Sequence, residues 1–372
     1  MSGSDIILEA VGLTRHFRAK KPSLFSAAPT VRAVDDVSFK VRRGETFAIV
    51  GESGCGKSTL SRLLLRLIEP TSGDIVFEGR NITAVPAEDL RRLRRKMQMI
   101  FQDPYSSLNP RMSVGALIGE PLAVHGVAAG AAREVRVAEL LGKVGLLPEH
   151  ARRYPHEFSG GQRQRIGIAR ALACGPALLI GDEPVSALDV SVRAQVINLL
   201  EDLKAEFGLT IVLVAHDLAV IRHTSDRVAV MYLGEIVELT DSDALFDGPL
   251  HPYTRMLLAA IPVPDPRARA AGVTAEGELP SPTNPPSGCR FHPRCGHVQP
   301  VCKERKPALA EHRPGHAAAC HFALAIAQGD EAGLAPPAAT DKRRERIALF
   351  ATAQAARAAS AALVQTRKGD MP

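Results

Sequence analysis

The sequence predicts an α/β fold with a buried parallel sheet, and four stretches of the chain support this. Residues 46–50 and 209–215 are short, largely apolar runs of the kind found in strands that are buried on both faces. Residues 176–181 have the same character, and residues 192–203 after them have helical periodicity. Strand, helix and strand in this order are typical of a parallel sheet with crossover helices.

Length and composition exclude several classes of protein. A chain of 372 residues with 45% hydrophobic and 23% charged residues is neither fibrous nor wholly disordered. Its apolar runs are far shorter than the ~20 residues that a membrane span needs, and its start resembles no signal peptide, so we expect an internal location. A net charge of +6 suits an acidic ligand or a membrane face. With 12 Phe, 4 Tyr and no Trp, the chain has few residues for stacking on bases, which argues against nucleic acid.

The character of the chain changes along its length. Residues 37–41 alternate between apolar and polar, which indicates a half-buried strand, and residues 87–144 have a helical character. Residues 261–316 are rich in Pro, His and Cys and read as loops. We therefore expect a main domain over residues 1–245, an extension over residues 246–323 and an Ala/Arg-rich tail over residues 324–372 that is flexible or a loose helix.

A glycine-rich segment directly follows the first buried strand. Residues 51–58, GESGCGKS, match the pattern G-x-x-x-x-G-K-[ST], and a predicted helix comes next. The glycines let backbone N–H groups surround a phosphate, and the helix N-terminus adds a favourable field for an anion. In this pattern Lys57 reaches the β- and γ-phosphates and Ser58 offers its hydroxyl to Mg²⁺. A chance match is the alternative, and the flanking strand and helix argue against it.

Two acids end another predicted strand. Residues 177–181 deliver Asp182 and Glu183 at their carboxyl end, where α/β sheets bind ligands. Asp182 is suited to hold Mg²⁺ through water, and Glu183 to act as general base on the attacking water, because phosphoryl transfer needs little other covalent help. A solvated strand end is the alternative, and the phosphate loop upstream favours the functional interpretation.

Four further motifs occur in one order along the chain. Residues 158–162, FSGGQ, resemble the signature motif of ATP-binding-cassette (ABC) ATPases, and Gln102 resembles the glutamine of their Q-loop. Residues 186–189, SALD, resemble the D-loop, and His216 after an apolar run resembles the switch histidine. The resemblance implies that residues 1–245 form an α/β, P-loop (RecA-like) ABC ATPase domain, the nucleotide-binding domain, with an antiparallel β subdomain and a helical subdomain at about residues 103–160. A Cys-containing C-terminal extension follows it here.

This resemblance also implies roles for individual residues. Glu183, His216 and Gln102 are expected to be catalytic, and Ser58, Gln102 and Asp182 to hold Mg²⁺. Phe17 would stack on adenine, with a core position in an edge strand as an equal alternative. The residues expected to bind ATP belong to the phosphate loop, the signature motif and the D-loop, with that one aromatic residue: Phe17, Gly51, Ser53, Gly54, Cys55, Gly56, Lys57, Ser58, Thr59, Ser159, Gly160, Gly161, Gln162 and Asp189.

The signature motif implies an assembly. It precedes a predicted helix and so offers a second anion site, far from the phosphate loop in the sequence. In the family two cassettes face head to tail, and each signature helix covers the ATP held by the other cassette. Residues 103–158 would dock on a membrane-embedded partner. The resemblance thus implies a heterodimer with a second, related ABC ATPase, two integral membrane permease subunits and a peripheral location on the cytoplasmic face of the membrane.

Several segments outside these motifs resemble the oligopeptide/dipeptide importers. They include residues 109–112, NPRM, and residues 231–235, MYLGE, while residues 249–254, PLHPYT, and 277–282, GELPSP, resemble the extension of that branch. The likeness covers residues 7 to 323 and is greatest to the dipeptide-type F subunit. It implies ATP-driven import of peptides with an extracytoplasmic peptide-binding protein. Import of nickel or another small solute is one alternative, and a soluble ABC ATPase acting on nucleic acid or ribosomes is another.

Four of the six cysteines lie close together in the extension, with the spacing C-x₅-C-x₆-C-x₁₇-C. Four thiolates suit a [4Fe–4S] cluster or tetrahedral Zn²⁺. Structural zinc sites usually contain tight C-x₂₋₄-C pairs, so the wider spacing favours the cluster, and similar subunits of these importers carry one. Disulfides or free thiols are the alternative. The expected ligands are Cys289, Cys295, Cys302 and Cys320, with His292, His297 and His321 as further candidates for zinc.

Overall fold

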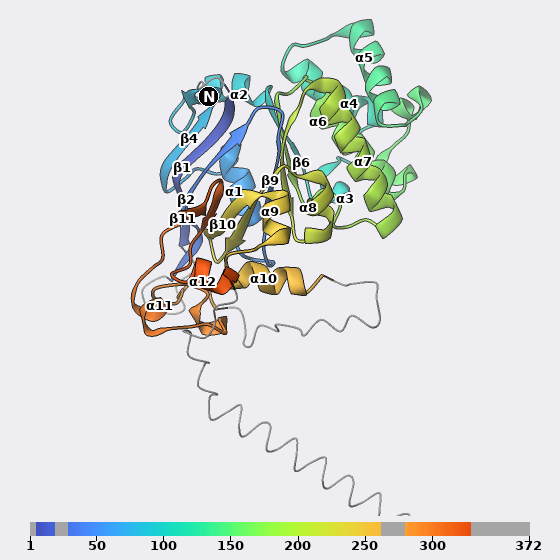
Figure 1. Ribbon diagram of the computed structural model, residues 1–372. Helices are drawn as coiled ribbons and strands as arrows, with labels where there is room; N and C mark the ends of the chain where they lie inside the picture. Colours follow the sequence, from blue (N-terminus) through green and yellow to red (C-terminus); the bar gives the residue numbers. More distant parts are fainter. Residues whose placement is uncertain (1–4, 19–28, 262–279, 329–372) are drawn as a thin grey trace, which may run out of the picture.

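The protein is described here by a computed structural model, which covers residues 5–18, 29–261 and 280–328. Figure 1 shows an antiparallel sheet beside the main sheet, a helical subdomain on the far side of the main sheet, and the extension below both sheets. Of the described helices, none is long and apolar enough to cross a membrane.

The main sheet has the strand order β11-β12-β10-β9-β3-β8-β7-β6. Its strands from β9 to β6 are parallel neighbours, as the sequence predicts, and β10, β12 and β11 extend it in antiparallel fashion. The strands are β3 (Thr46–Val50), β6 (Met97–Ile100), β7 (Leu178–Asp182), β8 (Thr210–Ala215), β9 (Arg227–Tyr232), β10 (Glu235–Asp241), β11 (Ala310–Arg313) and β12 (His316–Ala318). Every residue of β3, β7 and β8 is buried, which explains why their sequences are largely apolar.

The smaller antiparallel sheet has the order β2-β1-β4-β5. It contains β1 (Ile6–Arg18), β2 (Thr30–Arg42), β4 (Ser72–Phe77) and β5 (Arg80–Asn81). The alternation predicted at residues 37–41 is confirmed, because Phe39 and its apolar neighbours two positions away are buried while Lys40 is exposed. Phe39 stacks on Phe47 of β3 with ring centroids 5.0 Å apart, which joins the core of this sheet to that of the main sheet.

The helical subdomain consists of elements that follow β6. It contains α3 (Pro104–Ser107), α4 (Val114–Val124), α5 (Gly130–Lys143) and the 3₁₀ turns Pro148–Arg152 and Pro155–Glu157. The helices that pack on the main sheet are α1 (Lys57–Leu64), α6 (Gly160–Leu172), α7 (Val190–Phe207), α8 (Leu218–Thr224) and α9 (Ser242–Asp247), and α2 (Ala87–Arg94) precedes β6.

One sequence expectation for this region is wrong. The helical character predicted for residues 87–144 is interrupted by β6, an edge strand that pairs with β7 from Met97 opposite Leu178 to Ile100 opposite Gly181. Met97 and Met99 are 2% and 7% exposed because they pack into the core shared with the antiparallel sheet. Pairing with β7, some eighty residues later in the chain, makes these residues a strand, although their local sequence favours neither helix nor strand.

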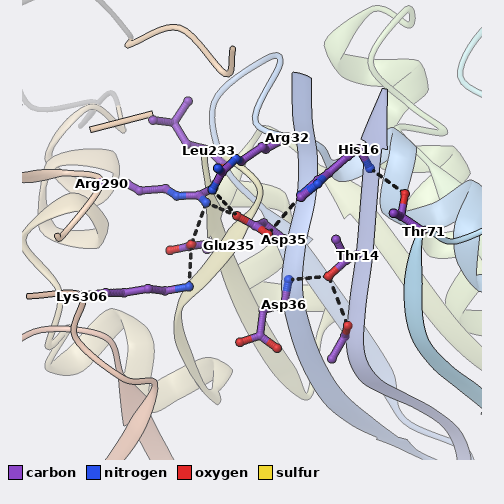
Figure 2. Close-up of polar contacts among 11 residues, drawn as sticks. Thr14, His16, Arg32, Asp35, Asp36, Thr71, Leu233, Glu235, Arg290 and Lys306 are labelled. Atoms are coloured by element: carbon purple, nitrogen blue, oxygen red, sulfur yellow. Dashed lines mark hydrogen bonds and ion pairs between the residues drawn. The ribbon is translucent and has the colours of Figure 1, made fainter. Parts of the chain in front are cut away.

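The extension is built from short elements, namely α10 (Pro252–Ala259), a 3₁₀ turn at His292–Arg294, α11 (Pro300–Glu304), β11, β12 and α12 (Ala323–Gln328). Arg290, 7% exposed, ties it to both sheets (Figure 2): its guanidinium bonds Asp35 of β2 and the carbonyl of Leu233, and its Nη2 lies 2.9 Å from Oε1 of Glu235. Lys306 pairs with Glu235 at 2.7 Å. Residues 324–328 of the expected tail belong to α12, whose Ile326 is 1% exposed, and the rest of the tail lies outside the described residues.

Candidate functional site

The phosphate loop packs so closely on neighbouring backbone that two of its glycines have no substitute. Gly51 has φ 154°, and a Cβ there would lie 2.2 Å from the carbonyl oxygen of Met231 in β9. Gly56 has φ 108°, and its Cβ would lie 2.0 Å from the carbonyl oxygen of Ala33 in β2. The loop is thus clamped between the two sheets, with its backbone at the carboxyl end of β3.

Lys57 and Ser58 leave this loop at the start of α1. The Lys57 Nζ, buried with the rest of its side chain, donates to the carbonyl oxygens of Gly51 and Glu52 at 2.8 and 2.9 Å. The Ser58 hydroxyl donates to Oδ1 of Asp182 at 2.8 Å. Burial raises the pKa of Asp182, and the Ser58 hydrogen bond opposes that shift. The side-chain oxygens of Ser58 and Asp182, 124 positions apart in the sequence, therefore meet. Oxygen atoms are the ligands that Mg²⁺ prefers.

Glu183 lies where three strand ends converge. Its Oε2 accepts a hydrogen bond from Nε2 of Gln102 at 3.0 Å and lies 3.2 Å from Nδ1 of His216. Gln102 follows β6, Glu183 follows β7 and His216 follows β8, so the parallel sheet brings together residues that are 81 and 33 positions apart. The backbone of Glu183 has φ 46°, a left-handed conformation that is unusual for this residue type and turns the chain sharply after the strand.

A cavity of about 380 Å³, which we call the phosphate-loop cavity, is lined by several of these groups, although Asp182 and His216 are not among its lining residues. Nine of the residues predicted to act on ATP line it: Phe17, Ser53, Gly54, Gly56, Lys57, Ser58, Thr59, Gln102 and Glu183. Sequence reasoning missed Val31, Ala33 and Pro282, which also line it. Pro282 belongs to the extension, and its carbonyl accepts a hydrogen bond from the backbone N–H of Arg32 at 3.1 Å. The GELPSP segment was the available signal, although nothing in it indicated a position beside the phosphate loop.

Two of the predicted residues differ in what they offer the cavity. Phe17 pairs with Val31 across β1 and β2, and the Arg15 guanidinium lies 4.5 Å from its ring centroid, so the ring is half-buried at the rim. The Cys55 side chain is 1% exposed and packs in the core under the loop, where burial raises the pKa of its thiol. Cys55 therefore does not line the cavity, in contrast to Phe17.

The signature motif lies apart from this cavity, whose lining includes none of its residues. Ser159 begins α6 with reciprocal caps: its hydroxyl accepts from the Gln162 N–H at 3.3 Å, and the Gln162 side chain accepts from the Ser159 N–H at 3.0 Å. A Cβ on Gly161 would lie 2.4 Å from Cγ1 of Val192 in α7. Asp189 is exposed at the N-terminus of α7. In a single chain the signature motif is therefore separate from the phosphate-loop cavity.

The four clustered cysteines surround a second, small cavity of about 20 Å³, which we call the cysteine cavity. His292, His297 and His321 also line it. The N–H of Cys289 donates to the carbonyl of Cys302 at 2.8 Å, and β12, paired with β10, delivers Cys320. Burial, helped by the neighbouring cysteines, raises the pKa of Cys289 to about 11 and those of Cys295 and Cys320 to about 12.

These thiols carry no bond to one another. All six cysteines of the chain are free, so the alternative of incidental disulfides is not seen. Within the described ranges, no set of three or more His, Cys, Asp or Glu side chains is arranged to hold a metal ion.

Comparison with known families identifies two parts of the chain. Residues 34–186 match the family described as ABC transporter, and this range includes the phosphate loop, the signature motif, Asp182 and Glu183. Residues 237–302 match the C-terminal region of oligopeptide/dipeptide transporters, which includes three of the four clustered cysteines.

Curated relatives match over most of their length. A probable peptide ABC transporter ATP-binding protein, y4tS, of Sinorhizobium fredii is 55% identical over 86% of this chain and 90% of its own. The oligopeptide transport ATP-binding protein AppF of Bacillus subtilis is 51% identical over 86% of this chain and 98% of its own.

Solved structures agree with the fold. The dimeric ABC MJ0796 in a post-hydrolysis state, bound to ADP and Pi, is 29% identical, with a TM-score of 0.57 over 63% of this chain and 99% of that one. CbiO1 of Clostridium perfringens, part of an ABC transporter complex, has a TM-score of 0.56 over 65% of this chain and 91% of its own. The chain belongs to the ABC transporter ATP-binding proteins with an oligopeptide/dipeptide C-terminal region, and it is an ATP-hydrolysing subunit.

Proposed function

We propose that this chain powers the import of peptides across the cytoplasmic membrane by binding and hydrolysing ATP. The observation that carries the proposal is the convergence of Lys57, Ser58, Asp182 and Glu183 at one sheet edge, in a chain that also has the oligopeptide/dipeptide C-terminal region. Relatives named as peptide or oligopeptide transport proteins favour peptides over nickel, and over a soluble ATPase that acts on nucleic acid or ribosomes.

In the proposed mechanism the phosphate loop and Lys57 hold the triphosphate, and Glu183 accepts the proton of the attacking water. Mg²⁺ would be held by Ser58 and Asp182, with Gln102 nearby, and would supply charge neutralisation on the β- and γ-phosphates. Gln102 and His216 both contact Oε2 of Glu183, so they fix the direction in which this carboxylate points. Phe17, at the rim of the cavity, is the proposed adenine contact.

The signature residues act on a different nucleotide in this proposal. Ser159, Gly160, Gly161 and Gln162, with Asp189, lie away from the phosphate-loop cavity and would complete the site of a second ABC ATPase chain. A related cassette, MJ0796, is dimeric in its solved structure. We expect the pair here to be a heterodimer. The isolated chain should then bind ATP and hydrolyse it slowly, because closure against the partner aligns the γ-phosphate.

A groove between β6 and the helical subdomain is the proposed docking site for the permease. It has a volume of about 540 Å³ and combines Leu67 and Phe101, 44% and 39% exposed, with the charged residues Arg94 and Glu120. Exposed apolar side chains inside a polar rim are typical of protein interfaces. Because Gln102 follows Phe101 directly, a partner in this groove would act on the contact between Gln102 and Glu183.

Purification of the tagged full chain from its own membranes tests the assembly. We expect two polytopic membrane proteins and a second ABC ATPase to co-purify, with ATP hydrolysis that rises when an extracytoplasmic peptide-binding protein loaded with peptide is added to proteoliposomes. Co-purification with nucleic acid or ribosomes, and no permease, would refute the import function.

The cysteine cavity is proposed to hold a [4Fe–4S] cluster. Its four thiols are the donor set of such clusters. Structural zinc sites usually contain tight C-x₂₋₄-C pairs, and the wider spacing of these four cysteines favours the cluster over zinc. The raised thiol pKa values mean that loading must displace protons, so it should weaken as pH falls.

Anaerobic purification distinguishes the occupants of this cavity. The cluster predicts brown protein with broad absorption near ~400 nm and about four iron per chain. A colourless preparation with about one zinc per chain would replace the cluster by zinc. Protein free of metal, with all four cysteines open to alkylation, would rule out both.

A further inference from the structure

Glu52, the second residue of the phosphate loop, is held by the extension at both its side chain and its backbone. The Arg294 guanidinium makes two parallel bonds to its carboxylate, Nη1 to Oε2 at 2.8 Å and Nη2 to Oε1 at 2.9 Å. The backbone N–H of Glu52 donates to the hydroxyl of Tyr253 at 2.8 Å. Position 52 is unspecified in the phosphate-loop pattern, so no motif indicates this contact.

Both partners of Glu52 are themselves fixed. Tyr253 is fully buried in α10, and its ring centroid lies 4.6 Å from that of Tyr232 and 5.4 Å from that of Phe291. The Arg294 side chain is 9% exposed, and its guanidinium lies 5.9 Å from the rings of Tyr232 and Phe291. A planar guanidinium in a two-bond contact, backed by aromatic rings, leaves the carboxylate little freedom.

The contact reaches the reacting groups in one further step. Nζ of Lys57, the lysine of the phosphate loop, donates to the carbonyl oxygen of Glu52 at 2.9 Å. Tyr253 fixes the peptide group between Gly51 and Glu52, whose carbonyl oxygen also accepts from Nζ of Lys57 at 2.8 Å. Arg294 fixes the side chain of Glu52. The phosphate loop is thus shaped from the extension as well as from the two sheets.

We propose that Arg294 and Tyr253 are positioning residues for ATP binding: acting through Glu52, they hold the phosphate loop in the shape that accepts the triphosphate. The extension thereby sets the nucleotide affinity of the catalytic domain. Arg290 provides the contrast, because it attaches the same extension to Asp35 and Glu235 without contacting the loop (Figure 2).

The test measures the Kd of the full chain for ATP with Mg²⁺ by calorimetry. Arg294→Met removes two charge-assisted hydrogen bonds, and we expect Kd to rise by about tenfold or more. Arg294→Lys keeps the charge and loses the two-bond geometry, so its Kd should lie between those of wild type and Arg294→Met. Tyr253→Phe removes one oxygen atom, and Kd should rise by about fivefold.

Two further variants separate positioning from a general loosening of the extension. Lys306→Gln removes an ion pair to Glu235 from the surface of the extension and should leave Kd unchanged. The exchange Glu52→Arg with Arg294→Glu rebuilds the pair in reverse and should recover most of the lost affinity. In the assembled transporter, KM for ATP should rise more than kcat falls.

The proposal is overturned if Arg294→Met and Tyr253→Phe bind ATP as wild type does. It is also overturned if the exchange recovers nothing while Lys306→Gln weakens binding equally, because the extension would then act only through its stability. Should Arg294→Met fail to fold, Tyr253→Phe and Arg294→Lys decide the question, since each changes few atoms.

Discussion

The phosphate-loop cavity lies at the carboxyl ends of β3, β6 and β7, whereas the cysteine cavity lies among turns and short helices. In the first, buried strands fix the backbone, and the chemical groups project from the loops that follow. In the second, each cysteine is placed by a different short element, and the separate core beside Cys320 consists of Leu250, Ala318 and Ala323. One chain therefore obtains precise geometry in two ways, from a sheet and from side-chain bonds.

The two regions should therefore fail differently. Loss of a reacting group in the first should remove activity and leave the fold, because the sheet persists without it. Loss of a side chain that holds the second region together should unfold or detach residues 280–328 as a whole, because these residues bury few large side chains of their own.

The largest expected effect is that of Glu183→Gln. The amide keeps the size and polarity of the side chain but accepts no proton from water, so ATP turnover in the assembled transporter should fall by about 10²–10⁴-fold. ATP binding should persist, because Lys57 and Ser58 are untouched. The rate of phosphate release checks this, with both ATPase chains carrying the change so that the partner contributes no turnover. Wild-type turnover would remove Glu183 from the role of base, and Glu201→Gln on the exposed face of α7 is the matched control.

Cys295→Ala should have the next largest effect, and on the extension rather than on the chemistry. If the four thiols share one metal centre, its loss should leave residues 280–328 open to proteolysis and bleach the anaerobic protein. ATP binding should remain measurable, because the phosphate loop is also clamped by β2 and β9. Mass mapping of the fragments checks the result against Cys174→Ala, a buried cysteine far from the cavity. Equal protease resistance in the two variants would show that the cysteine cavity needs no ligand.

The sequence predicts the first region far better than the second, for a physical reason. The phosphate loop, the acids after β7 and His216 are each encoded in a few consecutive residues, because each sits on a single loop. The strand β6 was missed because its four residues owe their conformation to pairing with β7. Pro282, Arg294 and Tyr253 were missed as parts of the nucleotide site because their contacts to Arg32 and Glu52 span the chain and leave no local pattern.

Arg290→Met should loosen the attachment of the extension by about 3 kcal/mol, because it leaves the carboxylates of Asp35 and Glu235 partly buried with fewer partners. The opening free energy of amides in residues 280–328, from hydrogen exchange, measures this. Lys306→Met is the control: its side chain is 52% exposed, so it should cost less than about 1 kcal/mol. If both substitutions lower the opening free energy by the same amount, the burial of Arg290 does not make its contacts stronger than those of Lys306.

Acid should weaken the same attachment. Burial acts to raise the pKa of Asp35, but the hydrogen bond and charge of Arg290 outweigh it, and the pKa lies below the ordinary value of 3.8. The pair therefore stabilises the fold above that value, and its contribution is lost as the pH falls through the lowered pKa. Hydrogen exchange at pH 5 and below pH 3.8 should show this loss in wild type and a smaller one in Arg290→Met. A loss of the same size in both would exclude Asp35 as its source.

The smallest effect is expected in α6, the helix that begins at the signature motif. Here the space available to a side chain, rather than a hydrogen bond or ion pair, decides the stability. A Cβ on Gly161 would lie 2.4 Å from Cγ1 of Val192, a stiff β-branched side chain, so Gly161→Ala should cost about 1–3 kcal/mol of overpacking. The gain in helix propensity, up to about 1 kcal/mol, opposes this without exceeding it. Adding Val192→Ala removes the clashing methyl groups, so the double variant should recover most of the loss and melt within a few degrees of wild type in a thermal scan. Val192→Ala alone controls for the lost contact. If Gly161→Ala melts like wild type, α6 and α7 can move apart at this point. The main sheet and its helices would then be less rigid than their buried strands indicate.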